Sequence, residues 1–198
     1  MTYLAKVGEL TLKGSNLHDF EILLMKNTRI YLEGRGCKVT LHAGRMYIEC
    51  EEKDSEAVEF TLKHLIGIAG WAKARVCERD LEEIKKAVFE EAKLCAERGA
   101  RTFKMEAKRS FKQFPLNSYQ ICCEAAGPVE EIMKVDVHNP DCIITVEVRE
   151  KTYVYSDSNK GCRGLPVGSS GRGLLLLSGG LDSPVAGYRM LRRGMRLE

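Results

Sequence analysis

Residues 174–188 read LLLLSGGLDSPVAGY, so that an apolar run leads into Ser-Gly-Gly-x-Asp-Ser and then directly into a helical pattern. Consecutive leucines predict a strand that is buried on both faces, as in a parallel sheet. The glycine pair allows a sharp turn and a close approach of the backbone to a ligand. The N-terminus of the following helix presents free N–H groups and the positive end of the helix dipole, which favour anions. The stretch therefore predicts a strand, a phosphate-binding loop and a helix.

The side chains of the loop indicate which kind of ligand it binds. Ser178 and Ser183 add hydroxyl donors, and Asp182 is an acid that a Mg²⁺ ion would favour beside phosphates. The sequence has no Gly-x-x-x-x-Gly-Lys-[Ser/Thr], the pattern of a Walker loop. An ordinary strand-turn-helix corner is the alternative, but the six-residue pattern between strand and helix favours phosphate binding. The pattern resembles the PP-loop of ATP pyrophosphatases, which cleave ATP between the α- and β-phosphates and leave an adenylated substrate.

The composition is that of a soluble globular protein with room for one or two domains: 198 residues, 44% hydrophobic and 30% charged. No apolar run approaches the length of a membrane span, and the N-terminus lacks the long apolar region of a signal peptide. The 8 cysteines are scattered, without a Cys-x-x-Cys pair or a histidine at zinc spacing. We therefore expect a reduced, cytoplasmic protein that has no membrane partner.

Positive charge is concentrated in two regions. From Lys160 onward, seven basic residues against two acidic ones give +5, so the remainder of the +3 chain carries −2. Residues 101–114 hold five basic residues and one acid. Such regions suit an anionic polymer such as nucleic acid, but they suit the solvated face of a strand equally well. Charge alone leaves these two interpretations open.

Periodicity and turn signals divide the chain into three parts. The first has a strand at 2–7, a helix from Asn16 to Gly34 and a hairpin over 37–50, a small ferredoxin-like unit. A glycine-bounded loop between its strand and helix either connects them or presents Lys13 to phosphates.

The second part mixes helices and strands. Helices are expected to begin at Asp54 or Ser55, at Asp80 and at Asn117, and the strand over 102–108 has a strongly basic polar side. A basic, Gly/Ser-rich linker follows. The third part holds the loop and a helix from Pro184 to Arg193. Arg189, Arg192 and Arg193 lie near the C-terminal end of that helix, where the dipole favours cations, and this is a sufficient structural explanation for them.

Further motifs follow one another along the chain: YLAKVGELTLKGSN at 3–16, TFK at 102–104, FPLNS at 114–118 and VDVHNPD at 135–141. GLPVGSSG at 164–171 then leads into the phosphate loop. With these motifs in this order, the whole chain resembles the tRNA 4-thiouridine synthetase family, also called tRNA sulfurtransferases or ThiI. The individual motifs are modest signals, whereas their order together with the loop is highly specific.

The resemblance implies an α/β (α+β) fold. A ferredoxin-like domain would occupy residues 1–53 and a THUMP RNA-binding domain residues 54–160. A linker at 161–172 would then lead into the first β-α unit of an incomplete, Rossmann-like PP-loop domain at 173–198. The first two domains would bind the acceptor end of a tRNA.

The resemblance also implies a reaction. Mg·ATP would adenylate O4 of a tRNA uridine, and a persulfide sulfur, supplied by a cysteine desulfurase, would displace AMP to give 4-thiouridine. The family also supplies sulfur for the thiazole of thiamine, and it suggests a homodimer.

Site residues follow from matching positions. The pyrophosphate would bind Ser178, Gly179, Gly180 and Ser183, with Asp182 near Mg²⁺. Backbone groups of Leu174 and Leu175 would face the nucleotide. The residues expected to contact tRNA are Lys13, Lys104, Lys108, Arg109, Lys112, Arg163 and Arg172.

The sequence departs from the family in one respect. A PP-loop domain needs further strands and helices after its first β-α unit, and the sulfur-relay cysteine of the family is expected beyond Glu198. We therefore assign no catalytic residue within this chain and expect that it cannot complete thiolation alone. The alternative function is a non-catalytic tRNA-binding module. The terminal β-α unit is expected to be disordered, to pack on the THUMP domain or to pair with a second copy.

Overall fold

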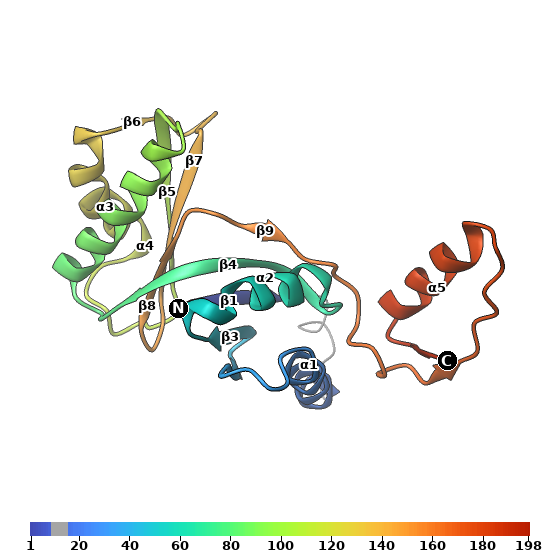
Figure 1. Ribbon diagram of the computed structural model, residues 1–198. Coiled ribbons are helices and arrows are strands. Elements are labelled where there is room, and N and C mark those ends of the chain that lie inside the picture. Colours follow the sequence, from blue (N-terminus) through green and yellow to red (C-terminus); the bar gives the residue numbers. More distant parts are fainter. Residues whose placement is uncertain (9–15) are drawn as a thin grey trace. The chain divides into compact units, whose positions relative to one another are not determined.

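The structure, a computed structural model, describes residues 1–8 and 16–198 (Figure 1). Lys13 and most of the glycine-bounded loop that contains it lie outside the described residues. The chain forms two compact units: unit 1 comprises Met1–Trp71 together with Asn159–Glu198, and unit 2 comprises Ala72–Ser158. The boundary between them falls inside strand β4 (Ile68–Cys77).

Unit 1 is built on a sheet with the strand order β2-β3-β1-β4. β1 (Thr2–Val7) and β2 (Lys38–His42) each pair antiparallel with β3 (Arg45–Glu49). The turn of the β2–β3 hairpin has φ of 47° at Ala43 and 71° at Gly44, the left-handed pair that matches the twist of the strands. The predicted strand and hairpin are thus confirmed. The short strand β9 (Asn159–Lys160) pairs with β4 and brings the C-terminal segment back to this unit.

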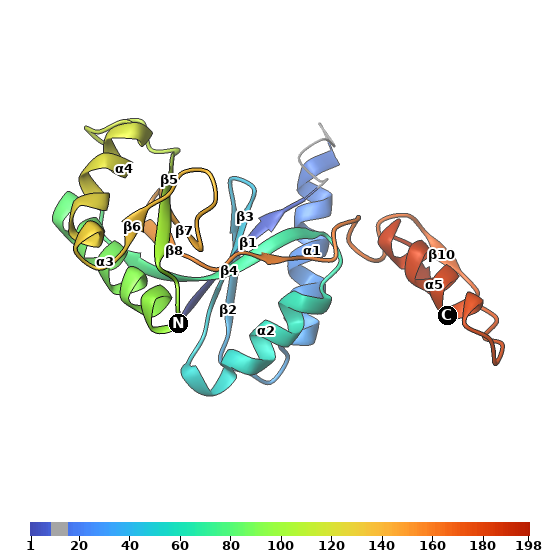
Figure 2. The ribbon, with the colours of Figure 1, turned by 90° about the horizontal axis from the view of Figure 1, so that it is seen from above.

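The core of unit 1 lies between this sheet and helices α1 (Leu17–Tyr31) and α2 (Ser55–His64), with the short 3₁₀ turn Glu52–Asp54 before α2 (Figure 2). We expected a domain boundary after residue 53, which would place α2 in the second domain. Val58 and Leu62, one turn apart on α2, instead share a buried core with Tyr3 and Leu24. Because the apolar face of α2 is covered by the first sheet, the compact unit extends to Trp71.

Unit 2 has a mixed sheet in which β5 (Thr102–Arg109) runs parallel to β6 (Lys134–Val135) and to β7 (Cys142–Val148). β8 (Thr152–Tyr155) pairs antiparallel with β7 and with the end of β4. Helices α3 (Leu81–Glu97) and α4 (Ser118–Ala126) lie on one side of β5 and β7 (Figure 1). The buried core beneath them contains Ile84, Val88, Ile121, Phe103, Ile144 and Val146.

Local capping places the helices of unit 2 where the sequence predicts them. The carboxylate of Asp80 accepts hydrogen bonds from the backbone N–H groups of Glu82 and Glu83 at 3.0 and 3.1 Å. Asn117 and Gln120 form a reciprocal capping box at the start of α4. The helix then tightens into the 3₁₀ segment Gly127–Glu131, which begins with Gly127-Pro128.

The C-terminal segment of unit 1 forms a small β-α-β element. β10 (Arg172–Gly173) pairs parallel with β11 (Arg196–Leu197), and α5 (Asp182–Arg192) connects them. The predicted strand at 174–177 is wrong: Leu174, Leu176 and Leu177 are 79%, 80% and 71% exposed and lie outside any strand. A strand buried on both faces needs neighbouring strands and a covering layer on each face, and β10 has one two-residue partner.

No helix in the described part of the chain is both long enough and apolar enough to cross a membrane.

Candidate nucleic-acid interface and phosphate loop

The loop before α5 is closed by its own hydroxyls. The Oγ of Ser183 accepts a hydrogen bond from the backbone N–H of Ser178 at 3.2 Å and lies 3.3 Å from the Ser178 hydroxyl. The N–H of Gly180 donates to the Ser178 Oγ at 3.4 Å. A Cβ placed on Gly179 would meet no atom within 4 Å outside its chain neighbours, so the loop faces open space. The structure thus brings Ser178 and Ser183 together, around a backbone that a ligand can approach.

The loop leads into an anion-favouring helix end. α5 begins at Asp182, and its N-cap, Leu181, makes no side-chain capping bond, so N–H groups of the first turn remain available. Free N–H groups, a helix dipole and two hydroxyls fit phosphate oxygens. The residues described contain no cluster of three or more His, Cys, Asp or Glu that could hold a metal ion. Asp182, the first residue of α5, is a carboxylate beside this loop that could contribute one ligand to a Mg²⁺ ion.

The backbone of the leucine run has other partners. The N–H of Leu175 donates to the carbonyl oxygen of Glu198 at 2.9 Å, so this donor is occupied. The side chain of Leu175 lies against α5, where a Cβ on Gly187 would come within 2.6 Å of its Cδ2. Leu174 points its side chain to solvent, with 79% exposure.

A second candidate surface lies on β5 in unit 2. Lys104, Glu106 and Lys108 alternate with the core-facing Phe103 and Met105, so they occupy the face of the sheet opposite α3 and α4. Lys104 pairs with Glu106 at 3.3 Å, whereas Lys108 is exposed. This face therefore carries one partly neutralised lysine and one lysine that is open to solvent.

Arg109, at the end of the same strand, has a structural role. Its Nη1 donates to the carbonyl oxygen of Phe114 at 3.0 Å and to those of Lys112 and Leu116 at 3.4 Å each. Phe114 is buried in the core of unit 2, so these bonds anchor the loop after β5. The exposed side chain of Lys112 is carried on that anchored loop.

A further basic residue, Arg79, lies beside the loop after β5 and was not predicted from the sequence. The guanidinium of Arg79 lies 4.0 Å from the centroid of the Phe111 ring, a cation–π contact. Arg79 is exposed and lies near the loop that carries Lys112. It stands 22 residues before the basic stretch at 101–114, so no local run of charge could reveal it.

The VDVHNPD motif proves to organise the loop before β7. Backbone N–H groups of His138 and Asn139 donate to Asp136, and those of Arg101 and Thr102 donate to Asp141 at 2.9 and 3.0 Å. These hydrogen bonds hold the pKa of both carboxyls below their usual value. Asp141 thereby ties the loop to the start of β5.

The other described residues that were predicted to contact tRNA, Arg163 and Arg172, lie in unit 1. Arg163 is exposed and has a left-handed φ of 58°, and its N–H donates to the carbonyl oxygen of Ile68 at 2.8 Å. Arg172 lies 3.8 Å from Glu198, with a largely exposed side chain. Arg163, Arg172 and the phosphate loop thus lie in unit 1, and the β5 lysines in unit 2.

Three family models match the chain in succession. The ThiI ferredoxin-like domain matches residues 2–72, the THUMP domain residues 78–157, and the model described as thiamine biosynthesis protein (ThiI) residues 168–198. A curated relative named "Probable tRNA sulfurtransferase", from Treponema pallidum (strain Nichols), is 45% identical over 201 residues, which cover 99% of this chain and 50% of the relative.

Solved structures agree with these matches. A 4-thiouridine synthetase crystallised as an RNA complex with bound ATP is 37% identical, with a TM-score of 0.86, and the match covers 100% of this chain and 51% of that one. PH1313 from Pyrococcus horikoshii Ot3 is 28% identical, with a TM-score of 0.89, over 99% of this chain and 66% of that one. The chain therefore spans about half the length of the curated relatives it matches.

Proposed function

The chain belongs to the ThiI family of tRNA sulfurtransferases, and from this premise we propose that it is the tRNA-binding part of such an enzyme. One observation carries the proposal: the whole chain matches a 4-thiouridine synthetase that was solved in complex with RNA and ATP. The basic face of β5 and the anchored loop beside it are consistent with that partner, because phosphate contacts provide most of the affinity for a nucleic acid backbone.

Lysines of unit 2 are proposed to contact tRNA phosphates. Lys108 and Lys112 are exposed, and Lys104 lies on the same face of β5 as Lys108. Arg109 would act mainly as a positioning residue, since its guanidinium holds the loop that carries Lys112. Lys13, Arg163 and Arg172 remain proposed contacts on unit 1.

The loop at 178–183 is proposed to hold the pyrophosphate part of ATP. The N–H group of Gly179 and the hydroxyls of Ser178 and Ser183 would donate to phosphate oxygens, Gly180 would let the backbone approach them closely, and Asp182 would lie beside Mg²⁺. In the whole enzyme, ATP would adenylate a uridine O4 with release of pyrophosphate, and the terminal sulfur of a protein persulfide would then displace AMP. The resulting S–S bond to the uridine would be cleaved by a second thiol, which forms a disulfide with the carrier sulfur and releases 4-thiouridine. Aimed N–H groups stabilise the negative charge that develops on phosphate.

The remaining partners belong to the same proposal. A cysteine desulfurase would deliver the persulfide sulfur in the cytoplasm, and the same sulfur would serve thiamine thiazole formation. A homodimer stays a prediction from the family resemblance.

A second candidate function, a non-catalytic tRNA-binding module, is favoured by one feature of the C-terminal segment. β10 has a two-residue partner, and the leucines after it are exposed, so the described residues do not enclose a nucleotide. For this chain by itself we therefore propose tRNA binding without thiolation. ATP–pyrophosphate exchange catalysed by the isolated chain would contradict the proposal that it is a non-catalytic tRNA-binding module.

Titration of tRNA at several salt concentrations tests the main proposal. The triple variant Lys104→Gln/Lys108→Gln/Lys112→Gln should bind more weakly, and its log–log salt slope should fall by about 0.7 to 0.9 per lost phosphate contact. A charge-matched control replaces Lys53, Lys86 and Lys93 with Gln, because each already pairs with a carboxylate, at 2.6, 2.9 and 2.8 Å. A wild-type affinity for tRNA that does not change with salt concentration would refute the proposal.

A further inference from the structure

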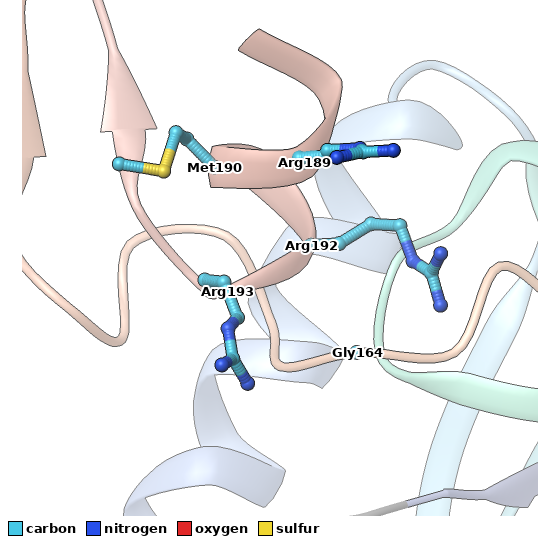
Figure 3. Close-up of a pocket in the computed structure, with 5 residues that line it drawn as sticks. All are labelled: Gly164, Arg189, Met190, Arg192 and Arg193. Carbon is cyan, nitrogen blue, oxygen red and sulfur yellow. The ribbon is translucent and has the colours of Figure 1, made fainter. Parts of the chain in front are cut away.

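The C-terminal end of α5 carries a group of arginines that the proposed sites leave unused. Arg189, Arg192 and Arg193, together with Gly164 and Met190, line a cavity of about 360 Å³ (Figure 3). All five residues belong to unit 1. We call the three arginines the α5 arginine cluster.

The cluster is built by helix spacing and by a close backbone contact. Residues three and four positions apart lie on the same side of a helix, which is the spacing of 189, 192 and 193. Figure 3 shows the side chains of Arg189 and Arg192 extending to the same side of α5, and Met190 extending to the other. The N–H of Leu165 donates to the carbonyl oxygen of Arg192 at 3.0 Å. Gly164 is packed so closely there that a Cβ would collide with the same oxygen, so the turn fixes one wall of the cavity.

The described part of the chain provides no acidic partner for the α5 arginine cluster. Among the residues that the structure describes, Arg172 and Arg196 lie 3.8 and 3.9 Å from Glu198, and no carboxylate lies within ion-pairing distance of the cluster. The guanidinium of Arg192 lies 6.0 Å from the Tyr188 ring, and its Nε is buried without a hydrogen-bond partner. Like charges at this spacing destabilise a helix, and an anion bound beside them would offset that repulsion.

The helix dipole, which from the sequence alone is a sufficient explanation for the three arginines, accounts for only part of the arrangement that the structure shows. Cations are stabilised near a helix C-terminus, which makes arginines tolerable at these positions. The dipole does not account for a buried, unpartnered Nε or for a cavity lined by three arginine residues. Guanidinium groups present planar pairs of donors that match phosphate oxygens.

We propose that the α5 arginine cluster binds phosphate groups of an RNA backbone. The inference rests on the proposed tRNA-binding function and adds a contact surface to it. The cavity lining offers charge without an aromatic ring or an amide to read a base, which suits backbone contacts. The cluster also lies at the opposite end of α5 from Ser183 and the phosphate loop, so it is separate from the proposed ATP site.

The test measures tRNA and ATP separately on the full 198-residue chain. The variant Arg189→Gln/Arg192→Gln/Arg193→Gln should lose at least about tenfold in tRNA affinity, and about 2 units of salt slope for three lost contacts. ATP affinity, measured by calorimetry, should be the same as in wild type. The charge-matched control is again the Lys53, Lys86 and Lys93 triple Gln variant, whose tRNA affinity should change much less.

A second variant separates loss of charge from loss of fold. Arg189→Lys/Arg192→Lys/Arg193→Lys keeps three positive charges and should keep most of the salt slope. Loss of the slope in this variant as well would overturn the electrostatic role of the cluster. Unchanged tRNA binding in the Gln variant, or loss of ATP binding in place of tRNA binding, would overturn the inference and leave the proposed function standing. A wild-type chain that binds no tRNA would instead refute the proposed function itself.

Discussion

The guanidinium of Arg109 donates a hydrogen bond to the carbonyl oxygen of Phe114 at 3.0 Å, and this bond ties the end of β5 to a buried residue of the next loop. Hydrogen bonds from a charged donor contribute about 1.5 to 3 kcal/mol, so Arg109→Ala should lower the free energy of unfolding by that amount. Lys108→Ala removes an exposed neighbour and should change it by less than about 0.5 kcal/mol. Urea denaturation of both variants measures the difference, and equal effects would remove the structural role of Arg109.

Protonation of Asp141 should weaken unit 2 in acid. Two backbone N–H groups hold its pKa below the usual value, so the folded state binds fewer protons than the unfolded state near that pH. The resulting stability is present above the unfolded pKa of about 3.9 and is lost as the pH falls through the lower folded value. Asp141→Asn should therefore melt at a lower temperature than wild type at neutral pH. The difference in melting temperature between the two proteins should become smaller as the pH drops below about 4.

Thermal melting followed by circular dichroism over this pH range measures that difference. Glu130→Gln, which alters an exposed carboxyl of the same unit, serves as the control. A gap between wild type and Asp141→Asn that stays constant down to acid pH would show that the ionised carboxylate is not the source of the stability.

Local signals and tertiary partners explain which features the sequence predicts. The starts of α3 and α4 follow from Asp80 and Asn117, because a capping side chain bonds N–H groups two or three residues away. The face of β5 follows from simple alternation. The assignment of α2 to the first core and the exposure of Leu174 depend on which strands and helices lie nearby, and no local pattern contains that information. The helix after the phosphate loop follows from a local pattern in the same way and begins at Asp182, whereas the strand predicted over 174–177 does not form.

Replacing one partner of the buried ion pair between Glu147 and Arg149 should lower the free energy of unfolding substantially. Arg149 Nε lies 3.0 Å from Glu147 Oε2, and the Tyr155 hydroxyl donates to Oε1 at 2.8 Å. Removing the cation leaves a fully buried carboxylate without its neighbouring charge, so Arg149→Met should lower the free energy of unfolding by about 3 kcal/mol. Lys86→Met breaks the exposed pair with Glu83 and should cost less than about 1 kcal/mol. Chemical denaturation that ranks the two variants in the reverse order would contradict this account.

The exposed leucines before the phosphate loop should make this chain bind apolar dyes and self-associate. Leu174, Leu176 and Leu177 project into solvent, close in sequence to the exposed Leu181, and exposed apolar side chains this close together in the sequence favour association. Leu174→Ser/Leu176→Ser should reduce the fluorescence of bound anilinonaphthalene sulfonate and the apparent mass in sedimentation, with little loss of stability. Leu175 packs against Gly187 on α5, so Leu175→Ser should instead loosen the β10-α5-β11 element and raise dye binding. The opposite signs of these two neighbouring changes separate an exposed apolar surface from a packed one, and equal responses would contradict the arrangement of side chains along residues 174–177.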